Sequence, residues 1–521
     1  MSPLAPAPLP PCPPLLPGFP LYRAAGLRAL EAAARGQPLM ERAGLAAADL
    51  AADLITGPRS EGPILILAGP GNNGGDAYVA ARHLQARFFP VHLVALGDPS
   101  QAPADARAAR QAFLDAGGSE LTAIPEHAPQ THWALIIDGL FGIGLQRPLT
   151  GAYASAVVAA NHLAKTQGCP LLALDCPSGL DGDTGRVLGP AIQASHTLAF
   201  IAHKPGLLTL DGPDHSGILH LAPLELDAPR LVPPEGHSIG REALAAHLLP
   251  RLRNSHKGSF GSAGILGGAR GMTGAALLAG RAALLLGTGR VFVGLADDSL
   301  GAPTFDPLQA ELMLRPADSL CEAPLTALAI GPGLGQSPQA RLWLARSLAT
   351  DLPLVLDADA LNLLAADPTL AQALATREAA SLLTPHPAEA ARLLGCEVAA
   401  VQADRIAAAQ ALSQQFAAWV ALKGAGTVVA APDGRWWINT SGNPGQAAAG
   451  QGDILTGITA ALLAQGWEAG TALLGAVHLH GTAADYLAGT GIGPAGLTAS
   501  ETAVAARTVF NAWSQPPALS A

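Results

Sequence analysis

Short runs of apolar residues, each ended by a loop of glycine and polar residues, recur along almost the whole chain of 521 residues. The stretches between these runs read as helices. A strand that is apolar on both faces has to be covered on both, which is typical of parallel sheets with crossover helices on either side. The pattern therefore predicts an α/β fold built on doubly wound parallel sheets.

The apolar runs fall into two groups, and the length of the chain suits two large α/β units, at residues 21–221 and 241–515. The stretch 222–240 is rich in proline and lacks periodicity, so we interpret it as a linker. Residues 1–20 are also proline-rich and are expected to form a disordered tail. The predicted strands are 64–68, 91–95, 134–137, 171–174 and 197–200 in the first unit, and 264–266, 290–293, 327–330, 354–356, 381–383 and 419–422 in the second.

Polar residues gather where the predicted strands end. In the first unit these segments are 69–76, 138–144, 175–179 and Lys204. Ligands of open α/β sheets bind outside the carboxyl ends of the strands, so we expect the four segments to meet at one crevice. One such loop could be an ordinary glycine turn, but four together favour a binding site. The second unit repeats the arrangement at 331–335, 357–362, 384–389 and 423–427.

A glycine-rich segment at 442–457 runs into an apolar-periodic stretch that reads as a helix. Gly450 and Gly452 would direct backbone N–H groups beyond the start of this helix, which predicts an anion site. Asp453 lies within it and would repel a phosphate, unless it takes a proton from a hydroxyl that is about to receive that phosphate. The alternative is that Asp453 only caps the helix.

Lysine is scarce, because only Lys165, Lys204, Lys257 and Lys423 occur among the 30 basic residues. The last three stand beside glycine or proline, where a compact ammonium group suits a phosphate or carboxylate ligand. Ordinary surface lysines in loops are the alternative interpretation.

The composition excludes several classes of protein. Hydrophobic residues make up 49% and mean hydropathy is +0.29, but no run of 18 uninterrupted apolar residues occurs, so no membrane span is expected. A net charge of −10 without a basic stripe argues against nucleic-acid binding. Five scattered cysteines indicate neither a disulfide framework nor a zinc site. The start of the chain lacks the basic residues of a targeting signal, and a reducing cytoplasm is the expected location.

Seven motifs of the second unit, in order along the chain, resemble those of the ADP-dependent NAD(P)H-hydrate dehydratases of the ribokinase-like superfamily. Four motifs of the first unit resemble those of the NAD(P)H-hydrate epimerases. The resemblance covers about residues 21–515 and implies a Rossmann-like first unit and a ribokinase-like second unit. The dehydratase motifs lie at 256–261, 274–276, 331–335, 357–362, 384–387, 423–427 and 450–453, and the epimerase motifs at 39–44, 72–76, 138–145 and 175–179.

The resemblance implies that the second unit dehydrates hydrated NADH or NADPH (NADHX or NADPHX) at the expense of ADP, with Mg²⁺ expected beside the nucleotide. Asp453 would be the catalytic base. The residues implied to bind the hydrate are Gly274, Ala275, Gly333, Gly335, His386 and Asp453. Those implied to bind the nucleotide are Lys423, Gly424, Ala425, Gly426, Thr427, Gly450 and Gly452. For His386, a packing role between two prolines is the alternative.

The first unit is implied to interconvert the two C6 epimers of the hydrate, because only one of them can be aligned with the base. Asp175 and, less directly, Lys204 are its catalytic candidates. Asn73, Asp138 and Ser178 would offer oxygen ligands to K⁺. The residues implied to bind its substrate are Asn72, Asn73, Gly74, Gly75, Asp76, Gly142, Ile143, Gly144, Leu145, Gln146, Arg147, Pro148 and Asp175. A homo-oligomer acting on small molecules is expected.

Two other functions stay open at this point. A ribokinase-like kinase would phosphorylate a small hydroxyl compound with the same chemistry and stop there. The first unit could also be a dinucleotide-binding module that regulates the second without catalysis. The sequence departs from the family pattern at Ala77, Gln446 and Gln451. Ala77 would change the local backbone, and the side chain of Gln451 is expected beside the anion site.

Overall fold

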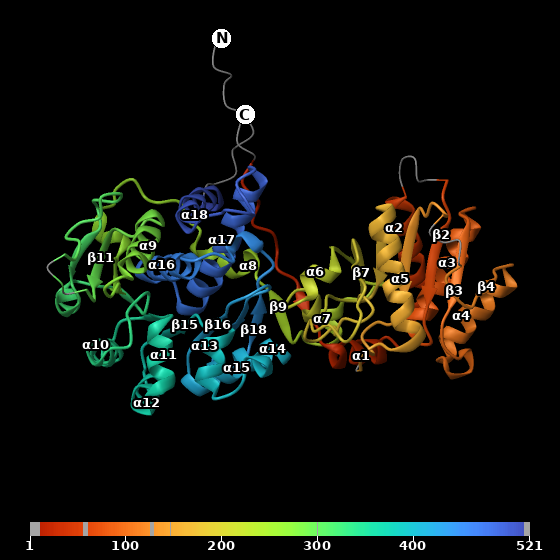
Figure 1. Cartoon of the computed structure of the whole chain (residues 1–521), viewed down its shortest axis with the longest axis horizontal. Helices are drawn as coiled ribbons and strands as arrows, with labels where there is room; N and C mark the ends of the chain where they lie inside the picture. The colour runs from red at the N-terminus through yellow and green to blue at the C-terminus, as the bar shows by residue number, and fades with distance from the viewer. Residues whose placement is uncertain are drawn as a thin grey trace, which may run out of the picture. The chain divides into compact units, whose positions relative to one another are not determined.

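The computed structural model describes residues 11–55, 61–125, 130–145, 147–297, 299 and 301–514. The chain divides into two compact units (Figure 1). The N-terminal unit is Pro20–Gly236, and the C-terminal unit combines the residues from His237 onward with the segment before Pro20. Each unit is built on its own sheet. No helix in the described part of the chain is both long and apolar enough to cross a membrane.

The N-terminal unit contains a parallel sheet of seven strands in the order β4-β3-β2-β5-β6-β7-β8. Its chain order reverses between β2 and β5, because β3 lies on one side of β2 and β5 on the other. In chain order the strands are β2 (Ile64–Ala68), β3 (Val91–Ala95), β4 (Glu120–Leu121), β5 (Leu135–Gly139), β6 (Leu171–Leu174), β7 (His196–Phe200) and β8 (Ile218–Ala222).

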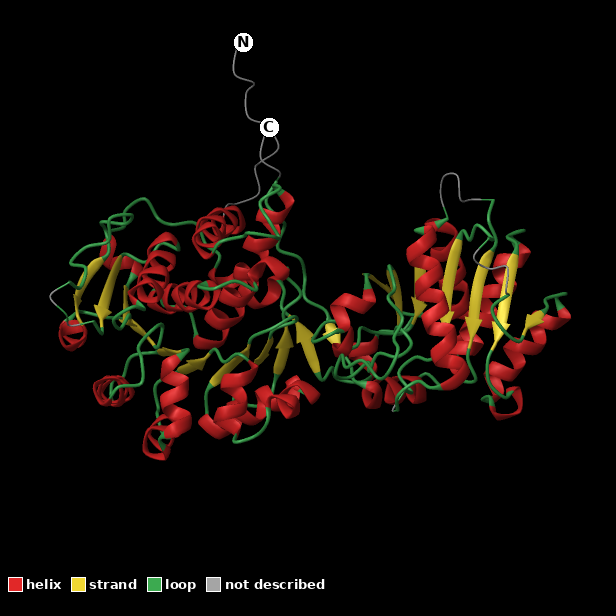
Figure 2. Cartoon of the chain, viewed as in Figure 1, coloured by secondary structure: helices red, strands yellow, loops and turns green. Residues whose placement is uncertain are grey.

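Alternate residues of β2 enter different hydrophobic cores. Ile64 and Ile66 pack into the core that includes helices α2 and α3, whereas Leu65 and Leu67 pack into the core that includes α5. Both faces of the sheet are therefore covered, as the two-faced apolar pattern predicts (Figure 2). The helices are α1 (Ala24–Ala33), α2 (Leu39–Leu54), α3 (Asn72–Ala86), α4 (Ala104–Asp115), α5 (Gly151–Gln167), α6 (Gly212–Ser216) and α7 (Ala228–Leu231), with short turns η2 (Pro99–Gln101) and η3 (Pro205–Leu207).

The larger sheet has the order β1-β9-β18-β17-β16-β15-β14-β13-β10-β11-β12. It is parallel from β12 to β16 and antiparallel across β16, β17 and β18. The order reverses between β10 and β13. In chain order the strands are β1 (Pro20–Leu21), β9 (Gly236–Ser238), β10 (Ser262–Gly267), β11 (Arg290–Leu295), β12 (Met313–Pro316), β13 (Ala327–Ile330), β14 (Leu354–Leu356), β15 (Ser381–Leu383), β16 (Trp419–Leu422), β17 (Val428–Ala430) and β18 (Trp436–Ile438).

One face of this sheet packs against the small-residue helices α9, α16, α17 and α18, whose Ala and Leu side chains form the main core of the unit. The α helices are α8 (Arg241–Leu244), α9 (Thr273–Leu285), α10 (Pro338–Leu348), α11 (Asp359–Ala366), α12 (Pro368–Ala375), α13 (Pro387–Leu394), α14 (Val398–Ala403), α15 (Arg405–Phe416), α16 (Gln451–Ala464), α17 (Ala469–Gly489) and α18 (Ala499–Ser514). Short turns are η4 (Ala245–His247), η5 (Lys257–Phe260), η6 (Ala317–Glu322) and η7 (Pro444–Gln446).

The segment before Pro20 differs from the disordered tail expected at 1–20. The indole of Trp513 donates a hydrogen bond to the carbonyl of Pro13, and Gly18 N–H donates to the Glu242 carboxylate. Cys12 and Leu15 pack against the core of the C-terminal unit. Proline keeps this part of the chain extended, and its apolar side chains then fix it to the surface. Residues 1–10 lie outside the described residues.

The stretch 222–240 also differs from the linker that was expected. It contains α7 and β9, and the chain passes from one unit to the other at Gly236 and His237. Leu224, Leu226 and Ala228 belong to the core of the N-terminal unit. The prolines here break periodicity without preventing burial, so a pattern based on regular elements does not detect the packing.

Candidate active sites

The carboxyl edge of the larger sheet carries the start of α16. Gly450 precedes the helix in the left-handed region (φ +86°), and Asp453 lies in the first turn. No side-chain capping hydrogen bond forms here, so the capping interpretation of Asp453 is wrong. Burial, reinforced by the nearby charge of Asp357, raises the pKa of Asp453 to about 7, although Lys423 acts in the opposite direction. This carboxyl group can therefore change its protonation state near neutral pH.

Lys423 follows β16, and its ammonium interacts with three acidic groups, which are Asp357, Glu389 and Asp453. Its Nζ lies 2.7 Å from Asp357 Oδ1 and 4.0 Å from Glu389 Oε2. Burial alone would lower the pKa of Lys423, but the charges of Asp357 and Glu389 raise it overall. Thr456, one turn beyond Asp453 on α16, donates to Asp357 Oδ2 at 2.8 Å. Lys423 is therefore charged and fixed in position beside the start of α16.

The loops after β10 and β13 meet where the order of the strands reverses. A Cβ at Gly333 would lie 2.8 Å from Met272 Cβ and 3.2 Å from Ala275 Cβ, so only glycine fits this approach. A Cβ at Gly274 would meet no other atom within 4 Å, which leaves its backbone accessible. Gly335 donates from N–H to Asp359 Oδ2 at 2.8 Å. The structure thus brings the predicted 274–275 and 333–335 segments together at the position where such sheets bind ligands.

His386 caps α13 rather than only packing between its neighbouring prolines. Its Nδ1 accepts hydrogen bonds from the N–H groups of Ala388 and Glu389, and the Glu389 carboxylate accepts from His386 N–H in return. This reciprocal pair is a capping box. The side chain of His386 is about half exposed, and its other ring nitrogen, Nε2, lies 3.3 Å from Glu389 Oε1.

The segment Lys423–Thr427 is the turn between β16 and β17. Buried Arg405 supports it by donating hydrogen bonds to the carbonyls of Leu422 and Lys423, at 3.0 and 3.2 Å. Thr427 Oγ1 donates to the Gly424 carbonyl at 3.1 Å. A Cβ on Gly452 would lie 3.5 Å from Lys423 Nζ. The predicted nucleotide segment and the start of α16 are therefore neighbours.

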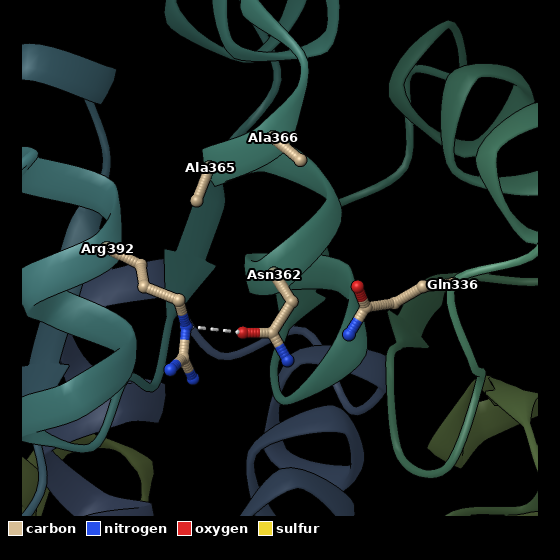
Figure 3. A pocket seen from close by; sticks show the side chains of 5 residues that line it. All are labelled: Gln336, Asn362, Ala365, Ala366 and Arg392. Atoms are coloured by element: carbon tan, nitrogen blue, oxygen red, sulfur yellow. Dashed lines mark hydrogen bonds between the residues drawn. The ribbon is translucent and has the colours of Figure 1, made fainter.

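A cavity of about 490 Å³ opens between α11, α13 and the residue that follows Gly335 (Figure 3). It is lined by the side chains of Gln336, Asn362, Ala365, Ala366 and Arg392. Arg392 Nε donates to Asn362 Oδ1 at 3.0 Å and so links α13 to α11. Asn362 ends the predicted 357–362 segment, whereas the other four residues lie outside the predicted segments.

In the N-terminal unit, three predicted oxygen donors come from β5, the loop after β6 and the start of α3. Asp138 is fully buried, and both of its carboxylate oxygens accept hydrogen bonds from Ser178, from Oγ at 2.7 Å and from N–H at 2.8 Å. Leu140 N–H also donates to Asp138 at 3.2 Å. Burial raises the pKa of Asp138 to about 6, although these hydrogen bonds oppose the rise.

Asn73 lies at the point where the strand order reverses, between β2 and β5. Its side chain is 7% exposed, and within the described residues neither Oδ1 nor Nδ2 has a hydrogen-bond partner. Burying an amide without a hydrogen-bond partner costs free energy. A bound group that the amide oxygen coordinates would offset this cost. Together with a buried carboxylate and a hydroxyl, the amide oxygen fits a hard cation. In the described residues no group of three or more His, Cys, Asp or Glu side chains is placed for a metal, so a site here would combine the one carboxylate of Asp138 with neutral oxygens.

Asp175 and Lys204 form a buried ion pair at the ends of β6 and β7. Lys204 Nζ donates to Asp175 Oδ1 and, at 3.2 Å, to the Phe200 carbonyl, and Lys204 is 0% exposed. Ile143 N–H donates to Asp175 Oδ2 at 3.3 Å. Asp175 also has a positive φ of 64°, a strained conformation for a residue with a Cβ. The predicted 142–148 loop and Asp175 therefore meet directly.

The segment 72–76, expected as a loop, forms the first turn of α3. Burial raises the pKa of Asp76 well above its usual range, and the charges of Asp175 and Glu31 add to the rise. Asp76 thus shares the crevice with the Asp175–Lys204 pair. Gln146, another predicted substrate residue, lies outside the described residues.

Comparison with known proteins places these two sites in one context. The family described as NAD(P)H-hydrate dehydratase matches residues 263–501. The family described as YjeF-related protein N-terminus matches residues 36–206. The bifunctional NAD(P)H-hydrate repair enzyme of Escherichia coli K12 is 40% identical over 435 residues, which are 81% of this chain and 80% of that enzyme. The enzyme of the same name from Moorella thermoacetica is 38% identical over 86% of this chain and 88% of its own.

The chain belongs to the bifunctional NAD(P)H-hydrate repair enzymes. It is an enzyme with two catalytic units, the epimerase at the N-terminal end and the dehydratase at the C-terminal end. A solved structure, the ADP/ATP-dependent NAD(P)H-hydrate dehydratase from Bacillus subtilis co-crystallised with ATP and Mg²⁺, is 33% identical and covers 53% of this chain and 98% of its own, with a TM-score of 0.47.

Two departures of this repair enzyme from its family pattern are explained by packing. Gln451 does not face the anion site as expected: its side chain is 4% exposed, with Nε2 bonded to Thr502 and Oε1 to His480. Gln446 contacts the other side of His480, at 2.9 Å. The two glutamines thus hold a buried histidine whose pKa burial lowers to about 4. They connect the start of α16 to His480 on α17 and to Thr502 on α18.

Ala77, the third departure, is fully buried in α3. A Cβ at Gly139 would lie 2.5 Å from the Ala77 methyl group, so the extra carbon of Ala77 is accommodated by the glycine that ends β5.

Several residues of the dehydratase and epimerase sites were missed. Thr456, which contacts Asp357 of the predicted 357–362 segment across 99 positions of sequence, was not predicted, and neither was Glu31, whose charge acts on Asp76 from α1. Glu389 could have been found, because His386 and Glu389 have the three-residue spacing of a capping box.

Proposed function

We propose that the N-terminal unit interconverts the R and S forms of NADHX and NADPHX, and that the C-terminal unit converts the S form to NADH or NADPH with ADP as phosphoryl donor. The observation that supports this most directly is the ionisable Asp453 beside the backbone amides at the start of α16, with Lys423 fixed next to it. AMP and phosphate would be the other products.

The dehydratase reaction needs a better leaving group than hydroxide. In the proposed mechanism Asp453 takes the proton of the C6 hydroxyl as its oxygen attacks the terminal phosphorus of ADP, and AMP departs. The C6–O bond then breaks, phosphate leaves with the electron pair, the ring nitrogen's lone pair supports the developing positive charge, and loss of the C5 proton restores the double bond. The Gly450 and Gly452 amides would stabilise the phosphoryl group during transfer.

The ammonium of Lys423 would face the nucleotide phosphates, and the turn Lys423–Thr427 would hold the nucleotide. Gly274, Ala275, Gly333, Gly335 and His386 would hold the hydrate. Support for this division comes from the approach of Gly333 to Ala275 on one side and of Gly452 to Lys423 on the other. Mg²⁺ bound with the nucleotide would neutralise part of the phosphate charge.

Epimerisation requires a bond at C6 to open and close again on the opposite face, with proton transfer at the oxygen. Asp175 and Lys204 form an ion pair in contact, and Asp76, whose pKa burial raises well above its usual range, is a further candidate for proton transfer beside it. The segments 72–76 and 142–148 would bind the phosphates and sugars of the substrate. Asn73, Asp138 and Ser178 would hold K⁺, whose charge would fix the loops that they belong to.

The proposal is tested by incubating the protein with mixed epimers of hydrated NADH and ADP while the absorbance of the reduced ring is followed. Both epimers should be consumed and AMP and phosphate should appear in equal amounts. A phosphorylated product that persists would instead identify a kinase. A contrary result is rapid consumption of one epimer while the other disappears no faster than it interconverts spontaneously. That result would show that the N-terminal unit is not an epimerase.

The setting of the enzyme is also part of the proposal. The five cysteines, all within the described residues, form no disulfide, which suits a reducing cytoplasm, and fractionation of cells would test that location. A homo-oligomer is proposed by likeness to the family and is tested by light scattering.

A further inference from the structure

The cavity lined by Asn362 and Arg392 has a chemistry that differs from the reacting centre. Its polar side chains are one guanidinium and two carboxamides, and Ala365 and Ala366 supply a small apolar wall (Figure 3). No carboxylate is among the side chains that line it. A guanidinium favours an anion. Gln336 and Asn362 each donate one amide N–H to Asp359 Oδ1, at 3.5 and 3.4 Å, which leaves their second amide N–H and the Gln336 oxygen for a heterocyclic base.

Arg392 can contact a ligand as it stands. Its recorded hydrogen bond to Asn362 uses Nε, so both terminal nitrogens remain available for the paired hydrogen bonds that guanidinium makes with phosphate. The bond also holds the guanidinium in place, because Asn362 lies on α11 and Arg392 on α13. A phosphate arriving there would meet a fixed charge rather than a freely moving side chain.

The cavity adjoins the proposed hydrate site on two sides. Gln336 follows Gly335 directly, and Gly335 is bonded to Asp359 at the start of the helix that carries Asn362. Arg392 lies six residues after His386 on the same helix, or about 9 Å along it. A ligand with its reacting ring near Gly333 and His386 would therefore extend towards this cavity.

A volume of about 490 Å³ is too large for a phosphate alone and falls in the range of small-molecule sites. A hydrated dinucleotide is a long molecule with a second nucleoside and further phosphate remote from the reacting ring. We infer that the cavity binds the adenosine-phosphate half of the hydrated dinucleotide, with Arg392 on a phosphate group. This inference rests on the proposed dehydratase function.

The decisive variants are Arg392→Ala and Ala366→Leu. The first removes the charge, and the second fills the cavity from an exposed helical position without removing a contact. Both should raise KM for the hydrate, by about tenfold for Arg392→Ala, as expected for a lost charged hydrogen bond, while kcat and KM for ADP stay near wild type. Arg435→Ala, which removes an equally exposed arginine from the β17–β18 turn, is the matched control.

Two further substrates sharpen the test. Hydrated reduced nicotinamide mononucleotide lacks the adenosine half, so wild type and Arg392→Ala should share one KM for it. The effect of Arg392→Ala on NADHX and NADPHX separates the two phosphate sources: an equal rise identifies the pyrophosphate, and a larger rise with NADPHX identifies the 2′-phosphate.

Unchanged KM for both dinucleotides in both variants would overturn the inference, as would a rise confined to ADP. The proposed function is judged separately, in the wild type, by whether ADP-dependent recovery of the reduced ring occurs at all. An unchanged kcat and KM for ADP report that the dehydratase unit of each variant is folded, and epimerase activity, which belongs to the other unit, is the control for enzyme concentration.

Discussion

At the scale of single residues, the dehydratase site is organised by charge compensation around Lys423. Asp357 is almost fully buried, and burial together with the nearby charge of Asp357 raises the pKa of Asp453. Lys423 limits that rise. Three residues separated widely in sequence thus set the protonation of the proposed base, and the effects of altering them can be predicted in sign.

Replacing Asp453 with Asn preserves size but removes the base, so dehydration should fall by at least ~100-fold while nucleotide binding survives. In the wild type the base must be ionised, so the rate should rise with pH through a midpoint near 7 and level off above it. The measurement is a pH profile of ADP-dependent dehydration. Near-normal turnover by Asp453→Asn would place the base elsewhere.

Replacing Lys423 with Ala should weaken nucleotide binding by about tenfold through loss of a charged contact. It should also move the pH midpoint of dehydration upward, because Lys423 lowers the pKa of Asp453. Titration of nucleotide binding and the pH profile measure the two effects. Lys165→Ala, on the exposed surface of α5, is the control, and an equal loss of epimerisation in Lys423→Ala would mean that the two activities share a site.

At the scale of elements, both sites lie where the order of parallel strands reverses, and helix starts supply part of each. This much follows from sequence, because apolar runs such as Ile64–Ala68 are buried on both faces and match their strands residue for residue. The edge strands β8 and β12 were missed, since partial exposure of their residues removes the fully apolar signal. Which loops face each other across a sheet was not predictable in detail, as the contact between Lys423 and Asp357 illustrates.

Removing the charge of Asp138 should abolish epimerisation, because the proposed ion would lose its only carboxylate and Ser178 two hydrogen bonds. Asp138→Ala should leave one epimer unconsumed where wild type clears both, with the other dehydrated at the wild-type rate. Chiral separation of the remaining hydrate measures this. Asp115→Ala, on the exposed end of α4, is the control, and clearance of both epimers by Asp138→Ala would contradict the assignment.

At the scale of the whole molecule, the dehydratase unit is assembled from two separate parts of the chain. A fragment with the boundary expected from the sequence, at residue 241, would lack the residues before Pro20 that pack on this unit. The sequence did not predict the contact of this segment with the dehydratase unit, because its described proline-rich residues form no regular helix or strand that a pattern could detect.

Deletion of residues 1–19 should therefore destabilise the dehydratase unit. Loss of several hydrogen bonds, each of about 1 kcal/mol, predicts a decrease of at least ~2 kcal/mol in its free energy of unfolding. Denaturant unfolding followed by loss of dehydratase activity measures it, with epimerase activity as internal control. An unchanged midpoint would show that the segment contributes nothing to stability.

The bond between Trp513 and Pro13 joins residues 500 positions apart. During synthesis on the ribosome, Pro13 emerges long before its partner Trp513, so this bond forms only after α18 has left the exit tunnel. The epimerase unit can be complete once Gly236 has emerged, with the early segment still waiting. The order of maturation thus follows from the connectivity: epimerisation becomes possible on the nascent chain, whereas dehydration waits for α18.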